Sequence, residues 1–338
     1  MSKAKLVQAR KITLFRAADN PRQLSRNIIT QKGASIVYIE VKENFPVKNL
    51  TSFKIGGAVE NLYYPRTQSE FIYLLKKLNS PIIMGNWSNV LISSSGIQGN
   101  VICTAKLCNV EIEDTQVIAD CGVKGPALAK IASEHELSGF EFMAGFPGSI
   151  GGNIYMNASA HQQSISDFLV TIEVFDTSTK EVLTIEKKTL KFAYRSSVLQ
   201  RRPYILLSAE FDLPKSKKNE ILGLIKKNML FRKAWQPNLS KPNAGSIFKN
   251  PEDMSAGRLL DSAGVKKFTV GDAKVWHKHA NFIVNEGNAT STDVLELMFM
   301  MYNAVKEKHS IKLEPEVKYF GVKSRREEYI WNILCDQR

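Results

Sequence analysis

The sequence predicts an α+β protein built of several lobes, and three observations carry this prediction. Segments with strand-like and helix-like apolar patterns alternate irregularly along the chain. The length of 338 residues exceeds that of one typical domain, and no internal repeat is visible. A polar, charged link at residues 214–219 separates a strand pattern from a helix pattern, so we expect a domain boundary there.

The composition narrows the class of protein. Apolar residues make up 43% of the chain and charged residues 23%, which is ordinary for a globular protein. No apolar run approaches the roughly 18 residues that a membrane span needs, so we expect no such span. The four cysteines contain no Cys-x-x-Cys pair, and we expect buried free thiols instead of a disulfide scaffold.

The net charge of +13 is concentrated at the N-terminus. Residues 1–39 carry eight Lys or Arg against one acid, Asp19. Such a segment suggests anionic partners, or an Arg-rich, acid-poor targeting segment, while a solvated basic tail explains it equally well. We expect residues 1–45 to be an extension, with regular structure beginning near Phe45.

In the first two thirds of the chain, apolar periodicity predicts two helices and six strands. The first helix presents apolar residues on one face, and the second has Pro126 in its first turn, where proline is tolerated. The expected helices are 68–79 and 126–137, and the expected strands are 81–84, 90–92, 100–103, 115–121, 170–175 and 204–211.

After the charged link, the pattern predicts two further helices and two strands around a loop rich in small residues. The helices are expected at 220–234 and 290–308, the strands at 280–284 and 313–320, and the loop at 238–251.

Two loops of small residues are the best candidates for a ligand site. Residues 145–152 form the densest glycine cluster, and residues 85–89 form a second loop between strands. Glycine lets backbone N–H groups approach phosphate oxygens closely. Either loop alone is as compatible with a plain tight turn, but together they could hold the two phosphates of a dinucleotide. Neither a P-loop motif nor a Gly-x-Gly-x-x-Gly motif is present.

Several polar residues are candidates for chemistry, with weaker signals. His277 and His279 lie two apart in a strand-like stretch, but no spaced third ligand accompanies them, so we predict no metal site. Glu314 and Glu316 would point to one face, where one of them could act as a general acid or both could face solvent. Arg195 could hold a carboxylate bidentately. These residues alone indicate an anion-binding enzyme that depends on a dinucleotide.

Seven motifs occur in an order that is far more specific than any one of them. They resemble those of the UDP-N-acetylenolpyruvoylglucosamine reductase (MurB) family, over about residues 50–321. The motifs are residues 50–57, 85–92, 137–158, 194–197, 244–251, 279–285 and 313–317. The short interval between Arg195 and Ser246 leaves no room for an insertion found in one subclass, so the chain resembles the type II subclass.

The resemblance implies a vanillyl-alcohol-oxidase-type FAD-binding domain of two lobes at 46–216 and a UDP-sugar-binding α+β domain at 217–325. Residues 326–338 would be a tail. The two small-residue loops would hold the FAD diphosphate. The cofactor-binding residues implied are Gly85, Asn86, Ser88, Asn89, Gly145, Pro147, Gly148, Ser149, Gly151, Gly152 and Asn157.

The resemblance also implies the chemistry. NADPH would reduce FAD, which would then reduce UDP-N-acetylglucosamine enolpyruvate to UDP-N-acetylmuramate for peptidoglycan synthesis. Ser246 would protonate the substrate, and Arg195 and Glu316 would bind its carboxylate. Glu316 would need a raised pKa to stay protonated beside that carboxylate. Tyr194, Lys249 and Asn250 would contact the substrate.

One departure from the family pattern concerns the first loop. Asn86 and Trp87 stand where the family usually has more glycine, and Trp87 could narrow the loop or lie against the flavin ring. The resemblance further implies a cytoplasmic monomer, although the basic N-terminus leaves organelle targeting open.

Two other functions were weighed. An FAD oxidase or dehydrogenase on the same flavin domain would often tether its flavin through a histidine near the first loop, and none lies there. A basic RNA- or lipid-binding protein would need interleaved aromatic residues or a known binding module, and neither is evident.

Overall fold

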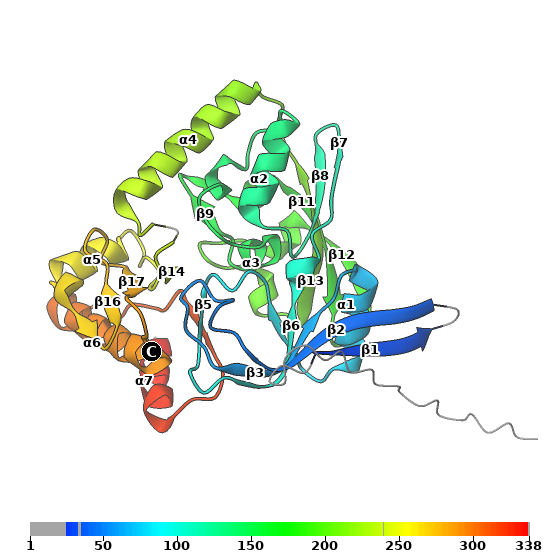
Figure 1. Cartoon of the computed structure of the whole chain (residues 1–338). Helices are drawn as coiled ribbons and strands as arrows, with labels where there is room; N and C mark the ends of the chain where they lie inside the picture. Colours follow the sequence, from blue (N-terminus) through cyan, green and yellow to red (C-terminus); the bar gives the residue numbers. More distant parts are fainter. Residues whose placement is uncertain (1–24, 33–34, 239, 337–338) are drawn as a thin grey trace, which may run out of the picture.

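The computed structural model describes residues 25–32, 35–238 and 240–336. This part of the chain begins with a mixed sheet of five strands (Figure 1). Its strand order is β1-β2-β3-β6-β4, with β1, β2 and β3 antiparallel and with β3, β6 and β4 parallel. The bounds are β1 Ser25–Lys32, β2 Ser35–Pro46, β3 Ala58–Tyr64, β4 Ile82–Met84 and β6 Ile97–Cys103. Helix α1, Gln68–Lys77, buries Phe71, Leu74 and Leu75 and is capped by Thr67.

The expectation that regular structure begins near Phe45 is wrong. Strand β2 pairs with β3 along most of its length, and Ile39 and Val41 are buried in the core. Between them Glu40 is only partly buried, so the alternation of a half-buried strand is present in the sequence. The excess of basic residues upstream drew the interpretation toward a solvated tail. The expectations for residues 1–24, including targeting, lie outside the described residues.

An antiparallel sheet of five strands forms the second lobe, in the order β12-β11-β13-β8-β7 (Figure 1). Helices α2 and α3 lie beside it, and their apolar residues join those of the sheet in the largest hydrophobic core. The bounds are β7 Val110–Glu113, β8 Gln116–Asp120, α2 Gly125–Glu134, α3 Ile150–Tyr155, β11 Leu169–Asp176, β12 Val182–Glu186 and β13 Tyr204–Asp212.

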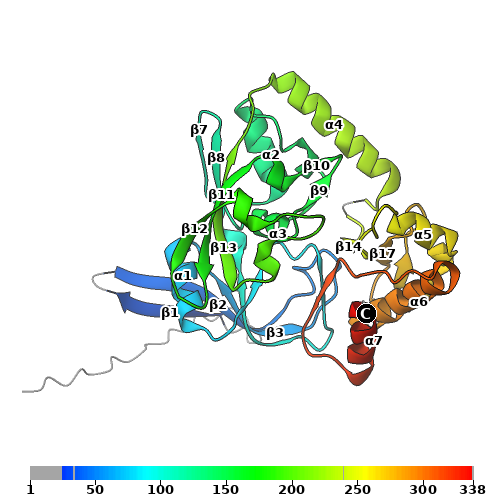
Figure 2. The same ribbon diagram turned by 180° about the vertical axis from the view of Figure 1, so that it is seen from behind.

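The long helix α4, Lys218–Trp235, runs from the second lobe to the third along the outside of the molecule (Figures 1 and 2). The third lobe is a four-stranded sheet, β14-β17-β16-β15, packed with α5, α6 and α7. The bounds are β14 Asn243–Ser246, α5 Ala256–Ser262, β15 Thr269–Val270, β16 Ala273–Val275, β17 Phe282–Asn285, α6 Ser291–His309 and α7 Arg325–Cys335.

The residues expected as a C-terminal tail instead form α7. Ile330 and Leu334 are fully buried in the core of the third lobe, and the Glu327 carboxylate accepts hydrogen bonds from Ser291 and Thr292 on α6. The amphipathic spacing of these residues and the Ser324 capping box explain why this segment is helical.

Residues from the two ends of the chain join the lobes. Strand β18, Lys318–Phe320, pairs in parallel with β5, Val90–Ile92. Phe53, Ile55 and Leu91 pack into the core of the third lobe. The first and third lobes are therefore held together by backbone pairing and by shared apolar contacts.

The longer elements expected from the sequence are confirmed, and several short ones were missed. The four expected helices correspond to α1, α2, α4 and α6. The expected loop 238–251 contains strand β14, and the expected strand 313–320 is reduced to β18. The remaining short elements are β9 Ser159–Ala160, β10 Gln163–Ser164 and the 3-10 turns Thr104–Lys106, Glu141–Met143, Ile165–Asp167, Lys187–Leu190, Val198–Gln200 and Val265–Lys267.

In the described part of the chain, no helix has the length and apolar character that crossing a membrane requires.

Candidate active site

A cavity of about 980 Å³ lies where the three lobes meet. Its wall contains both small-residue loops, the end of β14, part of α4 and the segment that leads into β18. Three residues expected to be catalytic, Ser246, Arg195 and Glu316, all line it. The expected cofactor residues that line it are Gly85, Asn86, Ser88, Asn89, Gly145, Pro147, Gly148, Ser149, Gly151 and Gly152.

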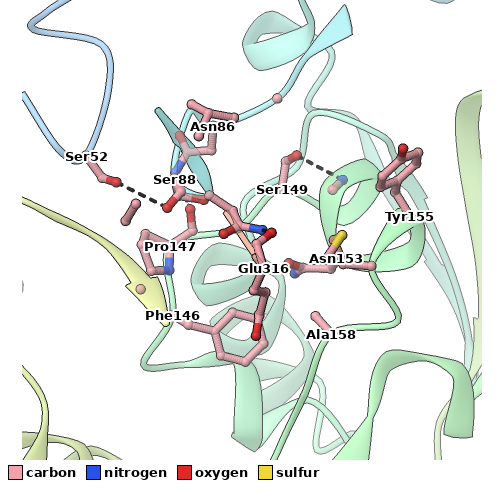
Figure 3. A pocket seen from close by; sticks show the side chains of 18 of the residues that line it. Ser52, Asn86, Ser88, Phe146, Pro147, Ser149, Asn153, Tyr155, Ala158 and Glu316 are labelled. Carbon is pink, nitrogen blue, oxygen red and sulfur yellow. Dashed lines mark hydrogen bonds between the residues drawn. The ribbon is translucent and has the colours of Figure 1, made fainter. Parts of the chain in front are cut away.

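The two small-residue loops contact each other directly. The Asn86 side-chain amide donates a hydrogen bond of 2.7 Å to the carbonyl oxygen of Pro147. Figure 3 shows Asn86 and Ser88 on one side of the cavity and Pro147 and Ser149 close to them. The two loops therefore lie side by side on the wall of one cavity.

Glycine is required at the points of closest approach. A Cβ at Gly85 would lie 2.1 Å from the Ser149 hydroxyl oxygen, and a Cβ at Gly148 would lie 2.0 Å from the Asn153 side-chain oxygen. Ser149 caps α3 by accepting a hydrogen bond from the Gly152 N–H at 3.3 Å. The two glycines thus let the loops pack closely against Ser149 and Asn153. Both loops line the cavity with small residues and backbone, which fits a diphosphate.

Ser52 ties the first loop to the third lobe. Its N–H donates to the carbonyl oxygen of Trp87 at 3.1 Å. Its hydroxyl lies 3.2 Å from the carbonyl oxygen of Ser88 (Figure 3). The same hydroxyl lies 2.7 Å from the carbonyl oxygen of Asn243. We did not single out Ser52 as a site residue, although it lies within the first motif of the resemblance.

Trp87 lies beneath the first loop. Its indole is 4% exposed in the core around Met84 and Val101, and its N–H donates to the Cys103 sulfur at 3.3 Å. The indole therefore supports the loop from the core, and Trp87 is also among the residues that line the cavity.

Arg195 occupies a strained tight turn. Its φ of +51° is left-handed, a conformation that costs a non-glycine residue of order 1 kcal/mol. Ala193 and Ser196 close the turn with two backbone hydrogen bonds of 3.1 Å. The Asn157 amide donates to the carbonyl oxygen of Ala193 at 3.0 Å. Asn157 is not among the residues that line the cavity, and its side-chain amide supports this turn.

The Arg195 guanidinium reaches back to Glu316. Nε donates to the Glu316 carboxylate at 2.8 Å, and a terminal nitrogen donates to the Ser159 hydroxyl at 2.9 Å. Both side chains are largely shielded from water, with exposed fractions of 16% and 12%. Burial raises the pKa of the Glu316 carboxyl group, although the nearby positive charge of Arg195 opposes that shift.

Backbone hydrogen bonds bring Ser246 and Glu316 to the wall of the same cavity. Ser246 ends β14 opposite Phe282, after Gly245 adopts a φ of +79° at an irregularity in the strand pairing. The Glu316 N–H donates to the carbonyl oxygen of Ile247 at 2.8 Å. Glu316 is thus hydrogen-bonded to the residue that follows Ser246, although the two are far apart in the sequence.

The three expected substrate residues line a separate pocket of about 280 Å³. The Asn250 N–H donates to the Tyr194 hydroxyl at 3.2 Å, and Lys249 forms an ion pair with Glu314. Glu314 and Glu316 therefore have different surroundings, since Glu314 is in this outer pocket and Glu316 faces the main cavity. The Arg195 guanidinium lies 5.1 Å from the centre of the Tyr194 ring, so the two pockets are adjacent.

The remaining candidates lie away from this chemistry. His277 and His279 follow β16 in a turn, not in a strand, and His279 accepts a hydrogen bond from the Asn281 N–H at 3.3 Å. Among the described residues, no cluster of three potential metal ligands occurs. All four cysteines are free; Cys103 and Cys121 are buried as expected, whereas Cys108 and Cys335 are exposed.

Several cavity residues were missed by sequence reasoning. Asn153 and Tyr155 come from α3, Arg232 from α4 and Lys318 from β18. Asn153 and Tyr155 lie inside one of the seven motifs, which was a usable signal. Arg232 lies outside all of them, and only the packing of α4 across the cavity reveals it.

Comparison with known proteins agrees with this arrangement. Residues 60–186 match an FAD binding domain, and residues 236–320 match the C-terminal domain of UDP-N-acetylenolpyruvoylglucosamine reductase. The chain is 41% identical over 284 residues to the UDP-N-acetylenolpyruvoylglucosamine reductase of Caldanaerobacter subterraneus subsp. tengcongensis, covering 83% of this chain and 93% of that protein. It is also 41% identical over 291 residues to that of Bacillus licheniformis, covering 84% and 95%.

A solved structure extends the similarity to three dimensions. The crystal structure of the UDP-N-acetylenolpyruvylglucosamine reductase (MurB) from Thermus caldophilus superposes with a TM-score of 0.72 at 31% sequence identity. The match covers 83% of this chain and 98% of that one.

Proposed function

Because the chain belongs to the UDP-N-acetylenolpyruvoylglucosamine reductase family, we propose that Ser246, Arg195 and Glu316 carry out the substrate chemistry of an FAD-dependent reductase. The enzyme reduces UDP-N-acetylglucosamine enolpyruvate, with NADPH as reductant, in peptidoglycan precursor synthesis. An FAD oxidase on the same flavin domain is not favoured, because the C-terminal domain matches this reductase family. The observation that carries our assignment is the convergence of the three residues on the cavity that both glycine loops line.

The two small-residue loops are our proposed site for the FAD diphosphate. Gly85 and Gly148 let the loops pack closely against Ser149 and Asn153 beside the cavity, and the Asn86–Pro147 hydrogen bond holds the loops together. When bound, FAD supplies the hydride chemistry that links NADPH to the substrate. We place the FAD-binding domain at about 46–216 together with β2, and the substrate-binding domain at 217–325 together with α7.

Arg195 and Glu316 are proposed to bind the substrate carboxylate. The guanidinium would neutralise the negative charge that grows on this group as hydride arrives at the neighbouring double bond. A protonated Glu316 would donate a hydrogen bond to the same carboxylate, and its burial favours that neutral form. The existing Arg195–Glu316 contact would then be exchanged in part for contacts with the substrate.

Ser246 is proposed to supply the proton that completes the reduction. Hydride and proton together saturate the double bond, and water afterwards restores the proton to the serine. A serine hydroxyl is a weak acid, so the donation needs a pre-organised site whose charges stabilise the developing product. The shielding of Arg195 and Glu316 from water fits this requirement.

The outer pocket is proposed to hold the UDP-sugar. Lys249 is shielded and paired with Glu314, and Tyr194 accepts a hydrogen bond from Asn250, so the cluster is already ordered. A phosphate could replace Glu314 as the partner of Lys249. We further propose that the enzyme works as a monomer in the cytoplasm, as the family resemblance implies.

The spectrum of the purified protein tests the assignment. We expect a bound-flavin spectrum that NADPH bleaches under anaerobic conditions and that UDP-N-acetylglucosamine enolpyruvate then restores. UDP-N-acetylglucosamine, which lacks the double bond, is the control and should leave the flavin reduced. A protein that cannot bind FAD, or whose reduced flavin does not respond to the enolpyruvyl sugar, would contradict it.

Ser246→Ala separates the two half-reactions. General acid catalysis typically contributes about 100- to 10,000-fold, so re-oxidation of the flavin by substrate should slow by that order. Reduction of the flavin by NADPH should keep its rate, because no proton from Ser246 is used there. Stopped-flow absorbance of each half-reaction measures both. Slow flavin reduction with normal substrate turnover would refute the proposed role.

A further inference from the structure

The main cavity carries an excess of positive charge. Among its described lining residues, Arg195, Arg232, Lys241 and Lys318 oppose a single carboxylate, that of Glu316. Arg195 pairs with Glu316, and Lys241 pairs with Glu286 outside the lining. In the described part of the chain, Arg232 forms no ion pair, and its Nε atom is buried with no hydrogen-bond partner. An arginine of this kind is poised for an anion that is not part of the protein.

Arg232 belongs to a polar stripe on α4. Asn228 and Arg232 are four residues apart, which places them on one face near the C-terminal end of the helix, and Gln236 is the residue that caps this end. All three line the cavity. The helix crosses from the second lobe to the third (Figures 1 and 2), and of its 18 residues only Ile221 is buried. Because so little of α4 is packed in a core, the cavity-facing stripe is one of its main contacts with the site.

Arg232 lies against the start of the second small-residue loop. A Cβ at Gly145 would be 3.1 Å from Cδ of Arg232, so the arginine stem passes directly over that glycine. Neither loop contains a lysine or an arginine. The loops themselves would therefore offer a diphosphate only neutral hydrogen-bond donors, and a balancing positive charge would have to come from another part of the cavity wall.

We propose that Arg232 binds the diphosphate of FAD, closing the site formed by residues 85–89 and 145–152 with a positive charge from α4. The inference rests on our proposed placement of the FAD diphosphate at those loops. A guanidinium stays protonated when buried and donates through several N–H groups, which suits phosphate oxygens. Burial without a carboxylate lowers the pKa of Arg232, and a bound phosphate anion would compensate for that loss of hydration.

Titration of the flavin-free protein with two flavins tests this proposal. FAD carries the diphosphate and riboflavin does not. Loss of one charge-assisted hydrogen-bonding group typically weakens binding by about 10- to 100-fold, so Arg232→Gln should raise the Kd for FAD by that factor. The Kd for riboflavin should be unchanged. Arg232→Lys keeps the charge without the fork of N–H groups, and we expect a smaller loss of FAD affinity.

The matched control is Lys233→Gln, which removes one positive charge from the same turn of α4 at an exposed position that does not line the cavity. It should leave both affinities unchanged. Equal weakening of FAD and riboflavin by Arg232→Gln would overturn the proposal, because it would indicate damage to the fold. So would unchanged FAD affinity with a raised KM for the UDP-sugar, which would assign Arg232 to the substrate diphosphate.

A wild-type protein that binds FAD no more tightly than riboflavin would show that the loops are not the diphosphate site. That result overturns the placement on which the proposal rests. It is distinguishable from a failure of Arg232 alone, in which wild-type protein prefers FAD and Arg232→Gln prefers it equally.

Discussion

At Glu316 a single carboxyl group is subject to two opposing effects. Burial raises its pKa, while the Arg195 guanidinium at 2.8 Å lowers it, and the upward effect is the larger. Between the ordinary value and the raised value, the folded protein therefore keeps a proton that a solvent-exposed glutamate would lose. This is the protonation state that a hydrogen-bond donor to the substrate carboxylate requires.

This shift predicts a pH dependence. As pH rises through the raised pKa of Glu316, the protonated fraction falls, so re-oxidation of reduced flavin by substrate should slow. In Glu316→Gln an amide that cannot ionise keeps a donor in place, and we expect a lower rate without that alkaline decline. Stopped-flow rates between pH 5 and 9 on both proteins would check this. An alkaline decline of equal steepness in Glu316→Gln would contradict the role of Glu316.

The identities of the candidate catalytic residues could be expected from the motifs, but their pairing could not. Residues 195 and 316 are separated by 121 positions, and nothing in the local pattern says that Arg195 contacts Glu316 while Lys249 contacts Glu314. The backbone bridge between Phe248 and Pro315 determines this pairing, because it fixes the register that turns Glu316, and not Glu314, toward the main cavity. Asn157 lies inside a motif expected to bind the cofactor, yet its side chain forms a hydrogen bond to the turn that holds Arg195.

At the scale of elements, the contact between the two small-residue loops predicts an energetic coupling. Gly85→Ala would push the Ser149 hydroxyl away from its capping position on α3, because the new Cβ would lie 2.1 Å from it. Loss of an N-cap costs about 0.5–2 kcal/mol of unfolding free energy. In a Ser149→Ala background the cap is already absent, so adding Gly85→Ala should cost much less.

Urea denaturation of the wild type, both single variants and the double variant measures this coupling. We expect the cost of the double variant to fall well short of the sum of the two single costs. Strictly additive costs would show that the close approach of Gly85 and Ser149 does not constrain α3.

Long amphipathic helices could be predicted and short glycine-rich elements could not. Helices α1 and α6 show one apolar face and side-chain caps, which local sequence specifies. Helix α3 has only six residues, two of them glycine, and the sequence alone does not identify Ser149 as its N-cap. Strand β14 has no apolar alternation, and it forms because β17 offers it an edge.

At the scale of the whole molecule, α7 contributes to stability although the sequence predicted a tail at residues 326–338. Ile330 is fully buried in the core of the third lobe, so Ile330→Ala should lower the unfolding free energy by about 2–5 kcal/mol. Asn332→Ala alters an exposed position on the same helix and should change it by less than about 0.5 kcal/mol. Urea denaturation compares the two, and equal small effects would mean that α7 is a tail after all.

The assembly of the lobes is the part of the architecture least visible in the sequence. The charged link at 214–219 was visible from composition, and α4 begins within it. The core of the third lobe is completed by Phe53, Ile55 and Leu91, which come from much earlier in the sequence. This contact depends on packing between segments that are far apart along the chain. Such contacts leave no periodic signal, because each segment looks like an ordinary buried stretch by itself.

The pairing of β18 with β5 also has a consequence for biosynthesis. The ribosome makes β5 more than 200 residues before β18, and β5 has no other strand partner in the described sheets. Until β18 emerges, the nascent flavin lobe therefore presents an open strand edge and the apolar side chain of Leu91, both of which favour aggregation. The carboxylate of Glu316 arrives with that same segment. We therefore expect the catalytic cavity to be completed only after β18 has emerged from the ribosome, and chains truncated before β18 to depend on chaperones or be degraded.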